Sequence, residues 1–482
     1  MKAMIKAHPV RHTRRRIALA VLALVVGLGA VGWNYLFRRD IKQYDDVEEY
    51  FLYGSTGTER VDGLPYWVWR VLPEVFASLM PEPGAGYEAF GFAYNETSDM
   101  PLGLTRVRIG FDRVGTTCAL CHLSVVRDSV GAPQRIYPSG TNVAFDGQRY
   151  FNFLFAAVND ARFTPDVLMP AMQAAGADFD PIEAVLYRHV LIPMVQKQVR
   201  AMQNRFSWWY EVPRAGPGRW IAFNDLKFFF AGQPRDGSIG NPDVPPLWNM
   251  APREAIGMMH WDGMSDDIWK TTQNAMIAPG GMRVSDVPWD KVRGLVDWWM
   301  QQPVPAYPWP VDDALAAEGA EVWAANCAEC HQIGTPGAGR VIPIDEIGTD
   351  RHRYDLLTPA TVEAYNQVAW HEYGFDPLEL RKTEGYASQL LDGVWLRAPY
   401  LHNGSVPSLE DLLKPPAERP VRFFRGGDVY DQARVGYVYE GAGAGSFLYD
   451  TTLPGNGNGG HLYGTELEAS QKVALIEYLK TF

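Results

Sequence analysis

Four cysteines and two histidines form two copies of one short pattern. They stand as Cys118-Ala119-Leu120-Cys121-His122 and Cys327-Ala328-Glu329-Cys330-His331, and the chain has no other cysteine. In a C-x-x-C-H pattern the two cysteines can form thioether bonds to the vinyl groups of one haem, and the histidine after them lies under the iron. The sequence therefore predicts two covalently bound haem c groups, attached at Cys118, Cys121, Cys327 and Cys330, with His122 and His331 as proximal iron ligands.

Two other uses of paired cysteines fit the pattern less well. A structural zinc site with four thiolates does not require a histidine directly after each pair, and its pairs usually lie closer together in the chain. A thioredoxin-like redox motif does not explain why both pairs are followed by histidine. Attachment of c-type haem outside the cytoplasm also agrees with the N-terminus of this chain.

The N-terminus carries an apolar run of 21 residues, Ile17 to Phe37, interrupted only by Asn34. A helix of this length reaches about 30 Å, the thickness of the hydrocarbon layer of a membrane. The basic residues of segment 1–16 precede the run, so the positive-inside rule keeps that tail in the cytoplasm and exports the rest of the chain. We therefore expect a protein that faces the periplasm.

The apolar run could be a retained membrane anchor or a cleaved signal. A cleaved signal usually ends in a small-x-small site, whereas this run ends in Trp33-Asn34-Tyr35-Leu36-Phe37. A retained anchor is the favoured interpretation. The membrane is accordingly one expected partner of the chain.

The length of 482 residues favours more than one folded unit. The segment 303–311 carries four prolines within a few positions of one another, which indicates a stiff linker. The expected division is a cytoplasmic tail (1–16), an anchor or signal (17–37), a lead-in (38–92), a first haem domain (93–302), the proline-rich linker (303–311) and a second cytochrome c domain (312–482). The fold class is predicted as mainly α, with two cytochrome c-like haem domains and long irregular loops after one N-terminal transmembrane helix.

Three helices that should position these groups can be predicted from local signals. Asp312 is a plausible N-cap for a helix that ends at Asn326, and Val473, Ile476 and Leu479 recur at a helical spacing near the end of the chain. The segment Ile182–Gln203 also reads as helical, with a kink or break expected at Pro193.

The second haem has to find its sixth ligand without methionine, because the last methionine of the chain is Met300. Histidine is then the expected ligand, which lowers the reduction potential relative to histidine–methionine ligation. His461 comes after a loop with four glycines that could approach a flat ligand closely, and His402 lies in a turn-rich stretch. His461 is preferred, His402 stays an alternative, and His352 and His371 are less favoured.

The first haem has fewer candidates. His189 falls in a helical apolar stretch, where a packed or structural role is expected. His260 precedes Trp261 in a polar and aromatic segment, and it could be a sixth ligand, a distal acid–base group or a structural residue. Methionine ligation also stays open in this domain. We take His260 and Trp261 as the candidate catalytic residues.

Several segments resemble the bacterial di-haem peroxidase superfamily. The two C-x-x-C-H motifs lie about two hundred residues apart, and the stretch Gly393–Leu409, which reads GVWLRAPYLHNGSVPSL, is similar to a segment of that superfamily. The ending Gly460-His461-Leu462-Tyr463-Gly464, together with Gly218-Arg219 and His260-Trp261-Asp262-Gly263, looks most like the rubber-oxygenase branch. The resemblance spans roughly residues 90 to 482.

In that branch the N-terminal haem is the active one, with an open distal side where dioxygen binds, and the C-terminal haem is bis-histidine and passes electrons. The resemblance implies the same arrangement here. The chain departs from the polymer-cleaving members by looking shorter and by carrying an apparent anchor. We therefore carry over the architecture and not the substrate.

The formal charge of −12 argues against a nucleic-acid partner, since phosphate binding needs a basic face. A redox partner protein or a small oxidant, dioxygen or peroxide, is the expected partner. The first functional hypothesis is a di-haem oxidoreductase with a reactive haem in domain one and an electron-transfer haem in domain two. The alternative is a pure electron carrier with two six-coordinate haems; no sequence feature favours a haem-bearing sensor or scaffold.

Overall fold

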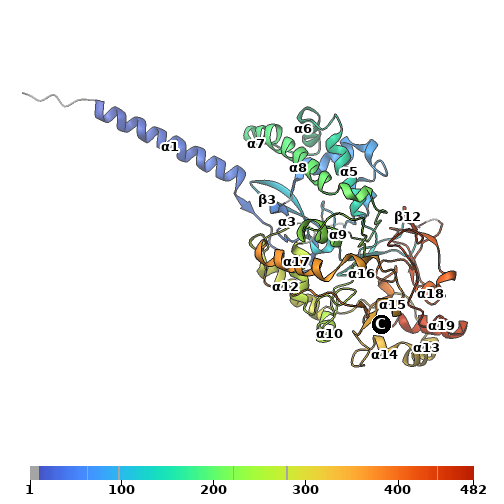
Figure 1. Cartoon of the computed structure of the whole chain (residues 1–482). Helices are drawn as coiled ribbons and strands as arrows, with labels where there is room; N and C mark the ends of the chain where they lie inside the picture. Colours follow the sequence, from blue (N-terminus) through green and yellow to red (C-terminus); the bar gives the residue numbers. More distant parts are fainter. Residues whose placement is uncertain are drawn as a thin grey trace, which may run out of the picture.

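The computed structural model describes residues 10–61, 63–95, 98–220, 222–277, 281–441, 443 and 445–482. Helices make up 45% of it and strands 11%, so the structure is helix-rich, as the sequence predicts. The predicted basic tail lies largely outside the described residues, which begin at Val10. Figure 1 shows α1 projecting away from a body formed by the rest of the chain.

The α-helices of the body differ widely in length. They are α2 (Val47–Tyr53), α3 (Thr58–Val61), α4 (Tyr66–Val75), α5 (Gly147–Asn159), α6 (Pro165–Ala174), α7 (Pro181–Leu186), α8 (Ile192–Arg205), α9 (Ala222–Asp225), α10 (Met250–Ala255), α11 (Ile268–Ile277), α12 (Trp289–Gln301), α13 (Asp313–Asn326), α14 (Ala328–His331), α15 (Ile344–Ile347), α16 (His352–Leu356), α17 (Pro359–His371), α18 (Leu409–Leu412) and α19 (Ala469–Leu479).

The strands are short. They are β1 (Arg39–Asp40), β2 (Leu64–Pro65), β3 (Leu104–Ile109), β4 (Phe111–Thr116), β5 (Leu123–Val126), β6 (Arg135–Pro138), β7 (Val341–Pro343), β8 (Gly385–Ala387), β9 (Arg422–Arg425), β10 (Tyr430–Asp431), β11 (Gly436–Tyr437) and β12 (Phe447–Asp450).

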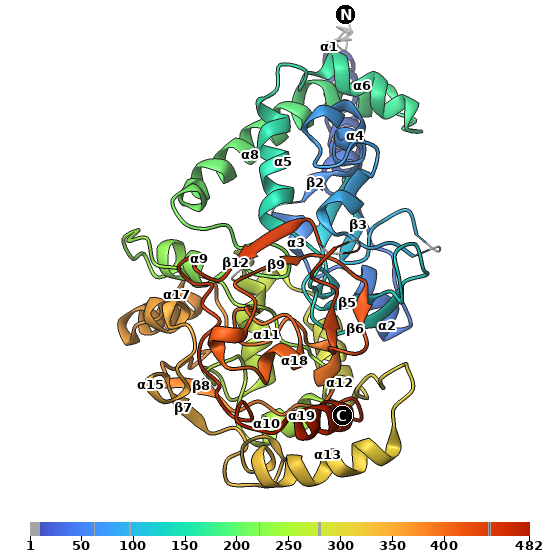
Figure 2. The ribbon, with the colours of Figure 1, turned by 90° about the vertical axis from the view of Figure 1, so that its right-hand side faces the viewer.

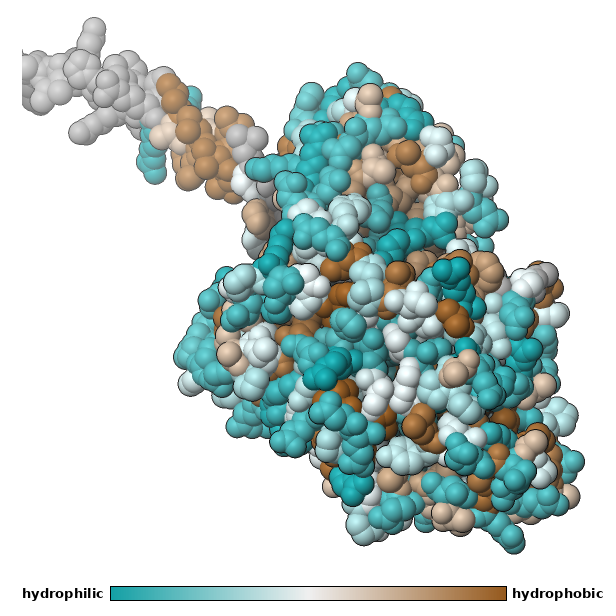
Figure 3. Space-filling model, turned by 45° about the vertical axis from the view of Figure 1, so that its right-hand side comes forward, coloured by the Kyte–Doolittle hydropathy of each residue, from teal (hydrophilic) through white to brown (hydrophobic). Residues whose placement is uncertain are grey.

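Helix α1 (Val10–Leu36) is, within the described ranges, the one helix long and apolar enough to cross a membrane. This finding rests on length and composition, and a signal sequence near the N-terminus would meet the same criteria. Its apolar side chains are exposed, among them Leu24 and Trp33, and its surface is largely brown in Figure 3. Exposed apolar side chains along a helix of this length suit either a membrane anchor or a signal sequence.

A four-stranded antiparallel sheet in the order β1-β3-β4-β2 connects α1 to the first cysteine motif. Strand β1 comes directly after α1 and pairs Arg39 with Ile109 of β3. Strands β3 and β4 form a hairpin around Gly110, whose φ of +72° suits glycine in a tight turn. Strand β4 ends at Thr116, one residue before the turn that carries Cys118.

The upper lobe of the body in Figure 1 contains a long helix built from α7, η4 (Tyr187–Leu191) and α8. The helix is not broken at Pro193, although the sequence indicated a kink or break there. Residues 187–191 form a π-helical turn, in which the N–H of Ile192 bonds to the carbonyl of Tyr187. The wider turn directly before Pro193 accommodates a residue that lacks an N–H donor.

The predicted helices around the second motif are confirmed. The carboxylate of Asp312 accepts the N–H groups of Ala314 and Leu315 and so caps α13. Helix α13 packs against the final helix α19 at Gly319, where an added Cβ would lie 2.0 Å from the carbonyl oxygen of Ala474. Gly319 of α13 therefore contacts α19, while Trp323 of the same helix lies beside His331 with ring centroids 6.2 Å apart. In Figures 1 and 2 both helices lie at the end of the body opposite to α1.

Two hydrophobic clusters join the chain before and after the proline-rich stretch 303–311. One contains Trp248 together with Trp395, and the other contains Leu226 together with Tyr365. The segments after β7 thus pack against the middle of the chain. The division into two separate haem domains stays a prediction.

Candidate haem-binding sites

The first cysteine motif forms a tight turn directly after strand β4. The hydroxyl of Thr117 accepts the N–H of Ala119 at 3.2 Å and caps the turn η3 (Cys118–Leu120). Burial raises the pKa of the Cys118 thiol to about 12 and raises the pKa of Cys121 as well. Both side chains are therefore uncharged thiols at neutral pH rather than reactive thiolates.

The ring of His122 is oriented by a backbone carbonyl from a distant loop. Its Nδ1 lies 3.1 Å from the carbonyl oxygen of Pro245, and burial lowers the pKa of the imidazole to about 4. Because a neutral ring carries one proton and the carbonyl can only accept, Nδ1 holds the proton and donates it. The other nitrogen, Nε2, keeps a free lone pair, which is the tautomer that a metal requires.

The second cysteine motif repeats this arrangement on a different scaffold. Cys327 ends α13, and the short helix α14 carries the motif to His331. The Nδ1 of His331 lies 2.6 Å from the carbonyl oxygen of Gln389, and burial lowers the pKa of this imidazole too. His331 thus presents a lone pair on Nε2 by the same logic as His122.

The ring of His461 lies opposite His331. The two ring centroids are 6.3 Å apart and their planes differ by 43°. Iron held between two imidazoles, with metal–nitrogen bonds about 2 Å long, separates the ring centroids by about 6 Å. The Nδ1 of His461 is buried without a hydrogen-bond partner, and burial lowers its pKa to about 4, so the ring is neutral. The pair fits a bis-histidine haem.

The described residues bring no three or more histidine, cysteine or acidic side chains together as a metal site. The two cysteine pairs accordingly do not meet in one four-thiolate site. Each pair is instead followed by its own histidine with Nδ1 bonded to a carbonyl, which is a donor set that suits haem c.

The backbone of the His461 loop is held by one arginine. Arg419 is only 2% exposed and comes after the short turn beyond α18. Its guanidinium donates to the carbonyl oxygens of Lys414 (3.0 Å), Asn458 (2.6 Å), Gly460 (2.9 Å), Leu412 (3.2 Å) and His461 (3.2 Å). Such bonds fix a loop in which His461 itself adopts a φ of +48°, in the left-handed region that side chains disfavour.

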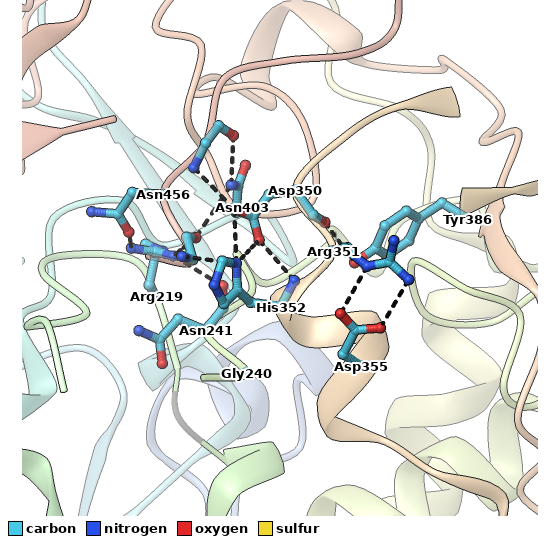
Figure 4. A network of polar contacts seen from close by, with 12 residues as sticks. Arg219, Gly240, Asn241, Asp350, Arg351, His352, Asp355, Tyr386, Asn403 and Asn456 are labelled. Carbon is cyan, nitrogen blue, oxygen red and sulfur yellow. Dashed lines mark hydrogen bonds and ion pairs between the residues drawn. The ribbon is translucent and has the colours of Figure 1, made fainter. Parts of the chain in front are cut away.

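A second polar network holds the start of the same loop, as Figure 4 shows. Arg219 donates to the side chain of Asn456 at 2.7 Å and to the carbonyl of Gly455 at 2.9 Å. Asn403 donates to the carbonyl of Gly457 at 3.0 Å. Asp350 accepts the N–H of Gly457 at 3.2 Å, and the Nδ1 of His352 lies 3.1 Å from the N–H nitrogen of Gly455. Residues from both halves of the chain thus position this loop.

The structure does not bring His402 against His331. The ring of His402 stacks on Tyr386 with centroids 4.2 Å apart, and its backbone carbonyl accepts the N–H of Asp243. Burial, with smaller contributions from Arg353 and Arg219, lowers its pKa well below the usual range. These contacts describe a neutral ring packed in the core.

His260 and Trp261 lie between the two motifs. The carbonyl of His260 accepts the side-chain N–H of Gln389 at 3.1 Å, and its ring packs edge-on against Phe223. The indole N–H of Trp261 donates to the carbonyl of Asp243 at 2.8 Å. The Nε2 of His260 is buried without a hydrogen-bond partner.

These contacts form a continuous path between the two proximal histidines. The Nδ1 of His122 bonds to the carbonyl of Pro245. Two residues earlier in the chain, the carbonyl of Asp243 accepts the indole N–H of Trp261. The residue before Trp261 bonds to Gln389, and the backbone of Gln389 bonds to His331. The path crosses from the first motif to the second through one tryptophan.

The remaining histidines are placed elsewhere. His189 is exposed on η4, and His371 is exposed at the end of α17, where its Nε2 lies 3.1 Å from Oε1 of Gln367. Sequence reasoning missed Pro245 and Gln389, because a backbone carbonyl has no residue-type signature. It also missed Arg419, because the sequence does not show that this arginine is buried and must therefore find acceptors.

Comparison with known proteins finds similarity to parts of this chain. Residues 385–424 match the family described as RoxA-like, cytochrome c-like, and this segment contains Gln389, His402 and Arg419. Two proteins of Sinorhizobium fredii (strain NBRC 101917 / NGR234) are similar to the chain. The one named uncharacterized protein y4iM is 32% identical over 286 residues, which cover 50% of this chain and 64% of that protein. The one named uncharacterized protein y4iJ is 30% identical over 234 residues, which cover 36% of this chain and 39% of that protein.

The chain thus spans less than two thirds of the length of these relatives. The matched segment contributes the carbonyl that orients His331 and the arginine that holds the His461 loop. The similarity of residues 385–424 to a RoxA-like cytochrome c domain supports a cytochrome c of this kind, implies haem c as the cofactor and suggests a haem-based redox function.

Proposed function

We propose that this chain is an exported, membrane-anchored di-haem cytochrome c that acts as an oxidoreductase on dioxygen or a peroxide. The first haem, on Cys118, Cys121 and His122, is the reactive one. The second, on Cys327, Cys330 and His331, transfers electrons. A haem iron supplies one-electron transfer, and with an open axial position it also binds and activates dioxygen or peroxide.

The proposal depends on an asymmetry between the two sites. Among the described residues, His331 and His461 make the one ring contact between two histidines. His461 would saturate the second site, since its ring faces His331 at the spacing that two axial imidazoles require. The two histidine candidates for the sixth ligand of the first haem are placed differently: His189 is exposed, and His260 packs against Phe223 beside Gln389, with its Nε2 buried and without a hydrogen-bond partner. This asymmetry is the single observation that carries the proposal.

His122 and His331 would each hold an iron through Nε2. Because their Nδ1 protons are donated to carbonyls, both rings keep one tautomer and one orientation while the iron changes its oxidation state. Donation to a carbonyl also increases the electron density on Nε2, which strengthens the ligand. The two proximal sides are therefore alike, and the difference in reactivity has to come from the distal sides.

Trp261 would connect the two sites, which gives it a role different from the catalytic one that the sequence indicated. Its indole bonds to the loop that orients His122, and the neighbouring carbonyl of His260 bonds to the residue that orients His331. Electronic coupling falls less steeply through hydrogen bonds and an aromatic ring than through the same distance of empty space. Electrons stored on the second haem could reach the first by this route.

Electron paramagnetic resonance of the fully oxidised protein tests the proposal. We expect one high-spin and one low-spin ferric haem in equal amounts, because only the second haem has two axial histidines. Two low-spin haems would instead favour a pure electron carrier that serves a redox partner protein. Two high-spin haems would show that His461 does not bind the second iron, which would contradict the proposed asymmetry.

A further inference from the structure

The long helix of the upper lobe exposes an apolar face to its surroundings. Ile182 and Val185 of α7 are 45% and 59% exposed, and Val190 of η4 is 48% exposed. The opposite side of the same helix buries Tyr187 and Leu191 in the core. Single exposed apolar residues are common on proteins, but here three lie within nine residues on the outer side of one helix, next to the exposed His189.

The charged residues of α7 and η4, Glu183 and Arg188, form ion pairs beside the apolar face. Glu183 pairs with Arg108 at 2.8 Å, and Arg188 pairs with Asp166 at 2.6 Å. Removing water from beside a charged group costs less free energy when the charge is paired than when it is single. The outer side of the helix can therefore approach an apolar phase without placing a lone charge in it.

The apolar face lies beside the end of α1. Asp180 caps α7 by accepting the N–H groups of Ile182 and Glu183, and it also accepts the hydroxyl of Tyr35 in the last turn of α1 at 2.5 Å. Figure 1 shows α7 as the part of the upper lobe next to the place where α1 meets the body. The apolar face thus begins two residues after Asp180, the residue that contacts Tyr35.

We infer that the face formed by Ile182, Val185 and Val190 inserts into the surface of the lipid bilayer that α1 crosses. This inference rests on the proposed membrane anchor. Tyrosine at the end of a membrane helix lies at the level of the lipid headgroups, so Tyr35 places α7 at that level. A helix at that level buries its exposed apolar residues at the boundary between headgroups and acyl chains.

Docking of this helix fixes how the protein stands on the membrane. The tether after α1 is short, since β1 begins at Arg39 and pairs at once with β3. With α7 as a second attachment point, the body cannot swing about the end of α1. The helices α13 and α14, which carry the second cysteine motif, then point away from the bilayer, at the far end of the body in Figure 1.

Thiol labelling of the full-length, haem-loaded chain in lipid nanodiscs tests the docking. The discs contain phosphatidylethanolamine and phosphatidylglycerol only, and the probe is a membrane-impermeant maleimide. Val185→Cys and Ile182→Cys report on the apolar face. Val130→Cys, on the turn between β5 and β6, is the matched control, because Val130 is 68% exposed. An unchanged haem absorption spectrum shows that each variant is folded.

We expect both helix variants to react at least about tenfold more slowly than Val130→Cys, because lipid excludes a water-soluble probe. Equal rates, in chains that still co-purify with the discs, would overturn the docking and leave the anchor standing. Chains that fail to enter the discs would overturn the anchor and the docking together. Protection in native membranes but not in pure-lipid discs would show that a membrane protein, and not lipid, covers this face.

Discussion

Replacing Arg419 by alanine tests how the sixth ligand of the second haem is held. The guanidinium makes five hydrogen bonds to backbone carbonyls, and three of them end on Asn458, Gly460 and His461. Burial lowers the pKa of Arg419 to about 10, so the group still carries its charge at neutral pH. The substitution removes the charge and all five bonds but leaves His461 in place.

The size of the effect can be worked out from these bonds. A hydrogen bond from a charged donor contributes about 1.5–3 kcal/mol net, and carbonyls that reach water recover part of that value. If the loop loses the equivalent of two such bonds, the state in which His461 binds the iron is destabilised by about 3 kcal/mol. This free energy corresponds to a factor of about 10² in the equilibrium constant. The fraction of molecules in which His461 has left the iron should rise by this factor.

Stopped-flow binding of carbon monoxide to the reduced protein measures that fraction. When ligand entry waits for His461 to leave, the slow phase assigned to the second haem should become about 10²-fold faster in Arg419→Ala. Arg419→Lys should recover part of the difference because it keeps one charged donor. Arg422→Ala is the control, since Arg422 is exposed on β9 and pairs with Asp450 at 2.8 Å. A slow phase that does not change in Arg419→Ala would refute the role of this arginine.

Other parts of the chain offer three further tests. Mass spectrometry should find two haem additions on the exported protein and only one when Cys327 and Cys330 are both replaced by alanine. Trp261→Phe should slow electron transfer between the haems in flash photolysis without changing either absorption spectrum, because it removes the indole bond but no ligand. Burial raises the pKa of Asp225 to about 7, although Arg205 and Arg235 oppose this shift. The folded protein therefore holds this proton more tightly than the unfolded chain, and its stability falls as pH rises from about 4 to 7. Asp225→Asn should therefore stabilise the protein by up to about 4 kcal/mol at pH 8 and have no effect at pH 4, as measured by urea denaturation.

The parts of the structure that the sequence predicts are those encoded by neighbouring residues. The two attachment motifs, the cap of Asp312 and the apolar run of α1 each occupy one short segment, so spacing and periodicity are enough to locate them. The sequence indicated a kink or break at Pro193, whereas the helix continues through this proline after a π-helical turn that has no signature in the sequence.

The features that require distant segments could not be predicted. The carbonyls that orient His122 and His331 come from positions 123 and 58 residues away in the chain. Every residue has a carbonyl, so residue type cannot single out Pro245 or Gln389. The choice between His461 and His402 likewise needs the packing: the glycine-rich loop favoured His461, but only the stacking of His402 on Tyr386 shows where the other ring lies.

The central claim is that His461 closes the second haem while the first stays open. The number of carbon monoxide molecules that the fully reduced protein binds in the fast phase, before His461 leaves the second iron, measures this directly. We predict one molecule bound per chain in the wild type, two in His461→Ala, and one in His402→Ala. A wild-type chain that binds none or two, or a second site that opens in His402→Ala and not in His461→Ala, would contradict it.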